Sequence, residues 1–196
     1  YLYMKVNSTV KYDSGTTTNS ASVIKSTVST AIVDHGTSQL KDFDKSFRYS
    51  NLVKVIDDAE VSVKSNQTSI SIKRFLYPAL GESEAYTLKF SNEIYHPSNT
   101  FWGAVSSGEF SYRDTANTLW EGCKIQDANG VAQVYRTSGQ DRIIVDSDVG
   151  TVTYTTGKMS LVGFYPIAIG SVSTGNTTPL EVSVVPSSSD VLPLRE

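Results

Sequence analysis

The sequence predicts an α+β protein in which an N-terminal helical segment packs with a β-rich, mostly antiparallel part of short strands. Two observations carry this prediction. Apolar residues recur at helical spacing between residues 20 and 36, and the apolar period changes to two after residue 59. With 196 residues, of which 39% are hydrophobic and 19% charged, the chain can also bury a core without disulfides. We therefore expect a globular fold.

The first expected element is an amphipathic helix over residues 20–36, about four turns long. Asn19 or Ser20 is available as its N-cap, and Gly36 is expected to stop it. Its apolar stripe consists of Ile24, Val28, Ala31, Ile32 and His35. A second, shorter helix is predicted to start at Ser50, and its inner side carries Leu52, Val53 and Ile56.

Alternating apolar residues predict strands in the rest of the chain. The first two strands hold Val61 with Val63 and Ile70 with Ile72, separated by a polar turn over residues 65–67. Further strand candidates are residues 86–90, 110–112, 123–126, 131–135, 143–145, 151–154, 159–162 and 180–185. The Asp-Ala-Asn-Gly sequence at residues 127–130 predicts a hairpin turn.

Residues 146–161 predict another hairpin, around a Thr-Thr-Gly turn. Its apolar anchors are Val149, Val152, Tyr154, Met159 and Leu161.

Two stretches without a clear period are expected to be irregular. Residues 92–108 are predicted to form a long loop that packs by its aromatic side chains, and residues 169–179 a flexible connection rich in Gly, Ser and Thr. From these patterns we expect a helix-containing α+β segment over residues 1–91 and a β-rich segment over residues 92–196. The two segments form either one continuous domain or two small lobes.

Charge and cysteine content exclude several classes of partner. The net charge is −3, and no basic cluster favours nucleic acid. The single cysteine, Cys123, has no second thiol for an internal disulfide or a zinc knuckle. No apolar run approaches the ~20 residues of a membrane span, so no membrane insertion is expected. Because the chain begins at Tyr1 without an initiator Met, we interpret it as a fragment of a longer polypeptide.

The polar residues predict no catalytic, cofactor-binding or metal site. The carboxylates at Asp57, Asp58 and Glu60 fit a solvated helix-to-strand junction better than an acid–base pair. Asp146 and Asp148 precede Gly150 but lack the fifth-position ligand and the distal Glu of a calcium loop. The two histidines, His35 and His96, stand apart from any nucleophile, and no nucleophile elbow, zinc or phosphate-binding motif occurs.

Aromatic residues are the remaining candidates for function. Trp102 and Trp120, with several tyrosines, would suit a sugar-stacking platform, but Tyr and Trp are also the residues most enriched in cores and protein interfaces. We predict an interface on the irregular stretch, with Tyr95, His96, Phe101 and Trp102 as its candidate residues.

Four short motifs occur in the order and spacing of one known family. The first is Phe47, Arg48, Ser50, Leu52, Ile56 and Asp57; the second is Tyr86, Leu88, Phe90, Asn92, Ile94, Tyr95, His96 and Pro97. The third is Gly150, Val152, Tyr154, Thr156, Gly157 and Lys158, and the fourth is Asp190, Val191, Pro193, Arg195 and Glu196. Together they resemble the bacteriophage baseplate wedge proteins of contractile-tailed phages, the baseplate-J-like family, in a C-terminal part.

The resemblance implies a structural subunit of a phage tail baseplate, in the virion, made in the host cytoplasm. It implies assembly with copies of itself and with other baseplate wedge proteins around the tail hub, and it implies neither catalysis nor a cofactor. An alternative function is a β-rich carbohydrate or receptor-binding module of a phage fibre. A glycan hydrolase is a third, weaker hypothesis.

Overall fold

The computed structural model describes residues 2–40, 45–170, 172–173 and 178–191, which form two compact units. We call Val6–Ile70 with the described residues from Ser188 onward the helical unit, and Ser71–Ser187 with residues 2–5 the strand unit. The described residues contain two helices and a large antiparallel sheet, which confirms the predicted α+β class. The predicted division into segments 1–91 and 92–196 remains a prediction. The boundary between the two compact units falls elsewhere, between Ile70 and Ser71.

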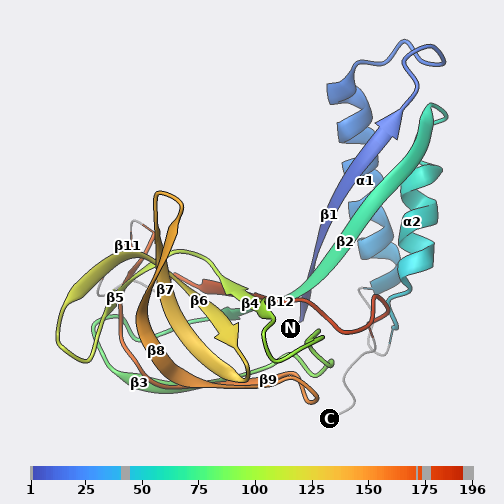
Figure 1. Cartoon of the computed structure of the whole chain (residues 1–196). Coiled ribbons are helices and arrows are strands. Elements are labelled where there is room, and N and C mark those ends of the chain that lie inside the picture. Colours follow the sequence, from blue (N-terminus) through green and yellow to red (C-terminus); the bar gives the residue numbers. More distant parts are fainter. Residues whose placement is uncertain (1, 41–44, 171, 174–177, 192–196) are drawn as a thin grey trace. The chain divides into compact units, whose positions relative to one another are not determined.

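The helical unit contains α1 (Ala21–Leu40) and α2 (Tyr49–Asp57), with the larger parts of β1 (Tyr3–Tyr12) and β2 (Val63–Leu76). The two strands pair side by side (Figure 1). The Tyr49 hydroxyl on α2 donates a 2.6 Å hydrogen bond to the backbone carbonyl of Thr68 on β2. The side-chain hydroxyl of Thr68 lies 2.8 Å from the hydroxyl of Ser8 on β1. Because the Ser8 side chain lines a cavity with residues of α1, both helices lie on the same face of the strand pair.

Both predicted helices are present, and the predicted end of the first is wrong. The Ser20 hydroxyl accepts a hydrogen bond from the Val23 N–H at 3.4 Å, as expected of an N-cap. The helix then runs through Gly36 to Leu40, since Gly36 keeps a helical backbone and nothing lies within 4 Å of where its Cβ would be. Ile24 and Val28 are buried, whereas Ile32 is half-buried. In α2, Leu52 and Ile56 are buried as predicted, and Val53 is half-buried.

The strands of the helical unit were predicted poorly. β1 was not predicted, and the polar turn at residues 65–67 is wrong because β2 continues straight through it. Asn66 shows why a polar residue suits this strand: its amide donates to the Val53 carbonyl at 3.3 Å and to the Asp57 carboxylate at 2.8 Å. These bonds tie β2 to α2.

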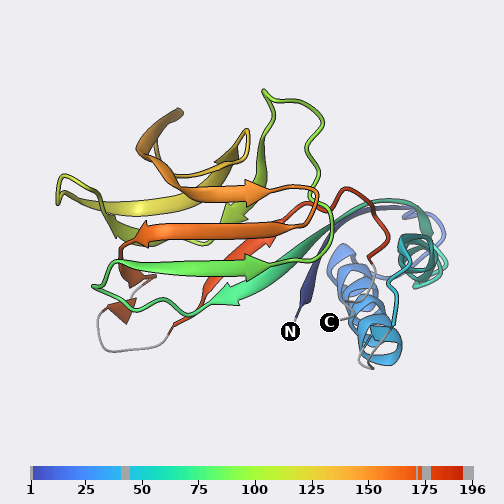
Figure 2. The same ribbon diagram turned by 90° about the horizontal axis from the view of Figure 1, so that it is seen from below.

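The strand unit holds the remaining strands and the end of β2. The strands are β3 (Glu84–Lys89), β4 (Trp102–Ser107), β5 (Phe110–Arg113), β6 (Leu119–Ala128), β7 (Val131–Ser138), β8 (Asp141–Thr153), β9 (Lys158–Phe164), β10 (Pro166–Ile169), β11 (Val172–Ser173) and β12 (Leu180–Val184). Neighbours follow the order β2-β12-β4-β6-β7-β8-β9-β3. Figure 2 shows β3, β9 and β8 side by side.

Strands of this unit form a ring that a chain connection, and not pairing, completes between β9 and β10. β5 pairs with β6, and β6 to β9 pair in succession. After Tyr165 the chain continues from β9 into β10, which pairs back onto β5. The ring encloses an aromatic cluster in which Phe164 lies 5.2 Å from Phe110 and 5.8 Å from Tyr112 between ring centroids. All three side chains are at most 2% exposed, so the cluster is the centre of the core.

The two predicted hairpins are confirmed. Asn129 (φ 48°) and Gly130 (φ 85°) form the turn between β6 and β7, with the positive φ values that a two-residue hairpin requires. The Thr-Thr-Gly turn joins β8 to β9, and its anchors Val149, Val152, Met159 and Leu161 are buried. A Cβ at Gly157 in this turn would collide with the Asn92 carbonyl oxygen, so only glycine fits there.

The prediction of one loop over residues 92–108 is wrong for its second half, which forms β4. Ala104 and Val105 on this strand are 1% exposed, and β4 pairs with both β6 and β12. In the second predicted irregular stretch, Ile169 ends β10 and residues 172–173 form β11; residues 171 and 174–177 lie outside the described part. Within the described residues, neither helix has the length and hydropathy of a membrane span.

Candidate interface and surface sites

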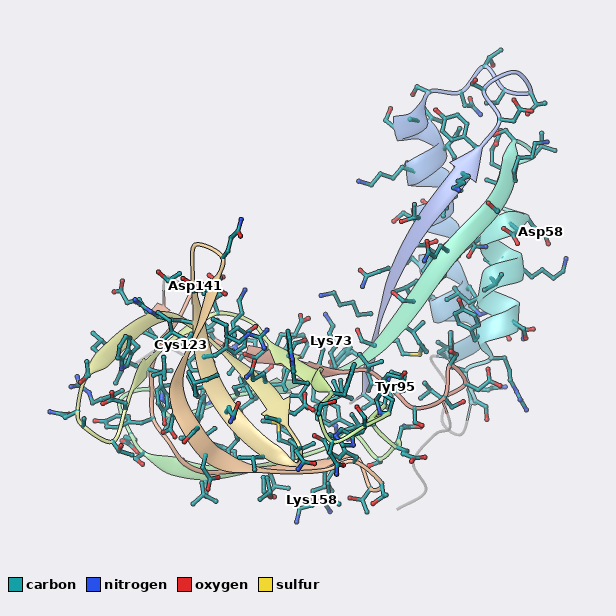
Figure 3. The ribbon with its side chains drawn as sticks, viewed as in Figure 1. Asp58, Lys73, Tyr95, Cys123, Asp141 and Lys158 are labelled. Atoms are coloured by element: carbon teal, nitrogen blue, oxygen red, sulfur yellow. The ribbon has the colours of Figure 1, made fainter. Side chains whose placement is uncertain are left out.

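The four predicted interface residues make three separate contacts. Tyr95, labelled in Figure 3, meets Phe101 edge to face, with ring centroids 5.4 Å apart at an interplanar angle of 85°. The Tyr95 N–H donates to the Val185 carbonyl at 2.9 Å, which fixes the backbone, while 41% of the residue stays exposed. Tyr95 and Phe101 therefore form one small aromatic pair on the irregular segment before β4.

His96 packs in a different direction. Its ring is stacked on that of Tyr154, with centroids 3.8 Å apart and an angle of 12° between the planes. The Tyr154 hydroxyl donates to Asp127 at 2.9 Å and accepts from the Gly130 N–H at 2.8 Å. Burial is the main reason that the pKa of Tyr154 rises to about 12, with the Asp127 carboxylate adding to the rise. His96 is thus fastened to the turn at the end of β8.

Asp127 is a structural residue that the sequence indicated only as part of a turn. It is fully buried, and its Oδ1 accepts the N–H groups of Gly103 at 3.0 Å and Val105 at 2.8 Å. Together with the bond from the Tyr154 hydroxyl to Oδ2, three donors compensate the buried carboxylate. Asp127 holds β4 against β6 and connects both to the β8–β9 hairpin.

Trp102 is the most exposed of the four predicted residues, at 55%. The guanidinium carbon of Arg142 lies 3.7 Å from the centre of its ring and 4.3 Å from the centre of the Tyr135 ring. Arg142 is therefore held between two aromatic side chains.

Most of the acidic residues discussed above have protein partners. Asp58, labelled in Figure 3, pairs with Lys54 one helical turn away at 2.7 Å, and the hydrogen bond to Asp58 raises the pKa of Lys54. Glu60 accepts the Ser62 hydroxyl and N–H, and the hydroxyl is the main cause of its lowered pKa. These contacts make the acidic junction a structural turn.

The second acidic pair is also engaged. Asp146 accepts the Tyr112 hydroxyl at 2.9 Å and the Asp148 N–H at 3.2 Å. Among the residues that the structure describes, no group of three or more His, Cys, Asp or Glu side chains could hold a metal ion.

Cys123 lies on β6 and is fully buried (Figure 3). Burial raises the pKa of its thiol to about 11, so the thiol stays protonated at neutral pH and is a poor nucleophile.

Two of the motifs that suggested a family meet in the helical unit. Asp190 accepts the Tyr49 N–H at 2.8 Å and an N–H of Arg48 at 3.0 Å, so it caps the start of α2. The Tyr49 N–H is the main cause of the lowered pKa of Asp190. Beside it, Phe47 and Val191 form an isolated antiparallel bridge. The other residues of the last motif, Pro193, Arg195 and Glu196, lie outside the described residues.

Each unit also has a cavity. In the helical unit, an open cavity of about 910 Å³ lies between α1 and the strand pair. Polar side chains line it together with apolar ones, which include Val6, Val10, Ile24, Val28 and Ile32. In the strand unit, a smaller pocket of about 570 Å³ lies beside Trp102, and six of its eight lining residues are polar or charged.

These features describe a β-rich protein whose candidate functional elements are exposed aromatic side chains, a cavity and a pocket. Asp127, Asp146, Asp190 and Glu60 serve hydrogen bonding, and Cys123 and His96 serve packing. Residues 1–74 match the family model described as baseplate structural protein gp6, C-terminal domain III. The matched residues comprise β1, α1, α2 and nearly all of β2. The match supports a structural protein of a bacteriophage baseplate, and hence a component of the virion tail. No curated protein matches the chain.

Proposed function

We propose that this chain is a baseplate wedge subunit of a contractile-tailed phage that assembles with copies of itself and with other wedge proteins around the tail hub. The observation that carries the proposal is the match of residues 1–74 to a baseplate structural domain. The matched model is described as a C-terminal domain, in keeping with a C-terminal part of a longer wedge protein of the baseplate-J-like family. The proposed role is structural, without catalysis or a cofactor, and follows synthesis in the host cytoplasm.

The open edge of β1 supports assembly. Among the described residues, β1 stands at the end of the strand order and pairs only with β2. An edge strand presents unpaired N–H and C=O groups, which proteins commonly cover with another chain or element. β1 has no fully buried residue, and its inward face, with Val6 and Val10, is half-buried. Its outer edge is therefore a natural place for a neighbouring subunit to add a strand.

The aromatic residues before and at the start of β4 are the second candidate contact. Tyr95 is 41% exposed and Trp102 is 55% exposed, whereas His96 and Phe101 are half-buried. Large aromatic residues of this kind act as anchors in interfaces, where each contributes about 2 kcal/mol or more. We propose Tyr95, Phe101 and Trp102 as anchors of this contact and His96 as a further residue of it.

The alternative function, a receptor-binding module of a phage fibre, has less support because the matched family model is of a baseplate protein.

Sedimentation velocity over a concentration series, for the chain alone and with purified wedge proteins, tests the assembly proposal. We expect the wild type to associate, and we expect Phe101→Ser combined with Trp102→Ser to weaken that association at least tenfold, since 1.4 kcal/mol corresponds to a factor of ten. Val162→Ser is the matched control, because Val162 is 68% exposed on β9 and belongs to no proposed contact.

A wild type that stays monomeric and binds no wedge protein would refute the proposal. A double variant that associates like the wild type would move the interface away from these residues, and the edge of β1 would then be the contact to test.

A further inference from the structure

The pocket beside Trp102 has the size of a small-molecule site. Its volume of about 570 Å³ lies within the range of ligand pockets in proteins. Four strands of the strand unit contribute to it, so its walls belong to the sheet itself. Its polar and aromatic lining consists of Trp102, Gln126, Gln133, Thr137, Asp141 and Arg142.

A chain of hydrogen bonds orients the polar side chains of this pocket. Arg142 Nη1 donates to Gln126 Oε1, and Gln126 Nε2 donates to Gln133 Oε1 at 3.0 Å. Gln133 Nε2 in turn donates to the Ser147 carbonyl at 3.2 Å. Gln126 is only 5% exposed, so the centre of this chain is protected from water. The amide groups are therefore fixed before any ligand arrives, which lowers the entropic cost of binding.

Three further polar side chains line the pocket and are exposed to solvent. Among the described residues, no hydrogen bond engages the side chains of Thr137, Gln140 or Asp141, all of which line the pocket. Asp141, at the start of β8, is labelled in Figure 3. Thr137 offers a hydroxyl that both donates and accepts, Gln140 an amide with separate donors and acceptor, and Asp141 two acceptor oxygens. The free groups thus recognise donors and acceptors in one ligand.

The Trp102 ring supplies a flat apolar surface next to these groups. Arg142 covers one face of the ring at 3.7 Å, and 55% of the residue remains exposed. Arg142 and Asp141 carry opposite charges, so the pocket has no net charge, which disfavours phosphates and nucleic acid. Apart from Trp102, Ala128 is the one apolar residue among those that line the pocket.

We propose that this pocket binds a neutral saccharide. A pyranose ring has C–H groups on one face, which suit the exposed surface of an aromatic ring, and hydroxyls around its rim that both donate and accept hydrogen bonds. In the proposed complex the sugar packs on Trp102, and its hydroxyls bond to Thr137, Asp141 and the free amide N–H of Gln133. The proposal does not depend on the baseplate function, since a structural subunit and a receptor-binding module could each carry the site.

Nuclear magnetic resonance of the full chain tests the proposal, because Trp102 and Trp120 give two indole N–H signals. Trp120 is an internal control: its Nε1 donates to Asp114 at 2.8 Å and it contacts Arg136, outside the pocket. We expect glucose, galactose or N-acetylglucosamine, titrated to about 10 mM, to shift the Trp102 signal while the Trp120 signal stays in place.

Variants separate sugar binding from assembly. Gln133→Ala and Thr137→Ala remove hydrogen bonds and are expected to weaken the sugar about five- to tenfold each, without changing the association state. Trp102→Ala is expected to abolish binding, and Trp120→Phe to preserve it. Since Trp102 is largely exposed, the fold should survive its replacement, and retention of the other amide signals checks this.

Three results would overturn the proposal. The first is that none of the three sugars moves the Trp102 signal, and the second is that both indole signals move together. The third is that inorganic phosphate shifts the Trp102 signal more strongly than any sugar, which would make Arg142 an anion site instead.

Discussion

The strand unit and the helical unit bury their apolar residues to different degrees. In the strand unit, Phe110, Tyr112 and Phe164 are each at most 2% exposed inside a ring of strands. In the helical unit, β1 has no fully buried residue, α1 buries only Ile24 and Val28, and a cavity of about 910 Å³ remains between them. A ring of strands that encloses its aromatic side chains buries its own core, whereas two helices on an open strand pair leave apolar surface available.

The largest effect is expected at the centre of the ring. Phe164→Ala removes a side chain with 0% exposure that contacts three other rings, and should lower the free energy of unfolding by about 3–5 kcal/mol. Urea denaturation followed by tryptophan fluorescence measures this, because both tryptophans lie in the strand unit. Val162→Ala, two residues away on the same strand and 68% exposed, is the control with an expected change near zero. Equal effects at the two positions would contradict the closed core.

A slightly smaller effect is expected at the buried carboxylate. Asp127→Ala leaves two backbone N–H groups of β4 without their acceptor and should cost roughly 3 kcal/mol. Tyr154→Phe removes only the hydroxyl that bonds to Asp127 and should cost about 1–2 kcal/mol. In a double-mutant cycle the two changes should be non-additive, since they share one hydrogen bond. Strict additivity would show that the bond contributes nothing to stability.

Substitutions in the helical unit should lower the free energy of unfolding by less, and by different amounts along α1. Ile24 is 3% exposed, and Ile24→Ala should lower the free energy of unfolding by about 2–3 kcal/mol. Ile32 is half-buried, and Ile32→Ala should lower it by about 1 kcal/mol. Far-ultraviolet circular dichroism during urea denaturation follows this unit, because both described helices belong to it. A larger loss at Ile32 than at Ile24 would mean that the cavity is closed in solution and that the helix packs along its whole length.

The smallest effect is a gain of stability. Gly36→Ala fills a mid-helical position with no atom within 4 Å of the new Cβ and should stabilise α1 by about 0.5–1 kcal/mol. The matched control is Gly139→Ala, where φ is +62° and the same change should destabilise. A melting temperature that falls for Gly36→Ala would restore the sequence-based prediction that the helix ends there.

The parts of the fold that depend on local chemistry could be predicted from the sequence. The Asn129–Gly130 turn and the Thr-Thr-Gly turn specify their hairpins through residues that tolerate positive φ, and the Ser20 cap marks the start of α1. The end of α1 was wrong because a single glycine stops a helix only where the backbone turns, and Gly36 stays helical. Local sequence signals therefore predicted the hairpin turns and the first residue of α1 better than the residue at which α1 ends.

Elements fixed by distant partners could not be predicted. β4 lies where the sequence predicts a loop, because its pairing depends on Asp127, a residue of another strand. β1 is not evident from the sequence because most of its residues are polar and none of them is fully buried. At the candidate site, the sequence indicated Trp102 as a candidate interface residue, and the structure shows that it is 55% exposed. Nothing in the sequence indicated that Arg142 and the Gln126–Gln133 chain would surround it, since these residues come from three other strands.

The position of β12 has a consequence for how the protein folds. This strand lies between β2 and β4, and its residue Leu180 pairs with Leu76, more than half of the chain away. During synthesis, β2 and β4 must wait with open edges until β12 leaves the ribosome. Such long-range pairing slows folding and leaves aggregation-prone folding intermediates exposed for longer. We therefore expect truncation before Leu180 to yield aggregates, and expect yield to depend on chaperones more than on the stability of the finished fold.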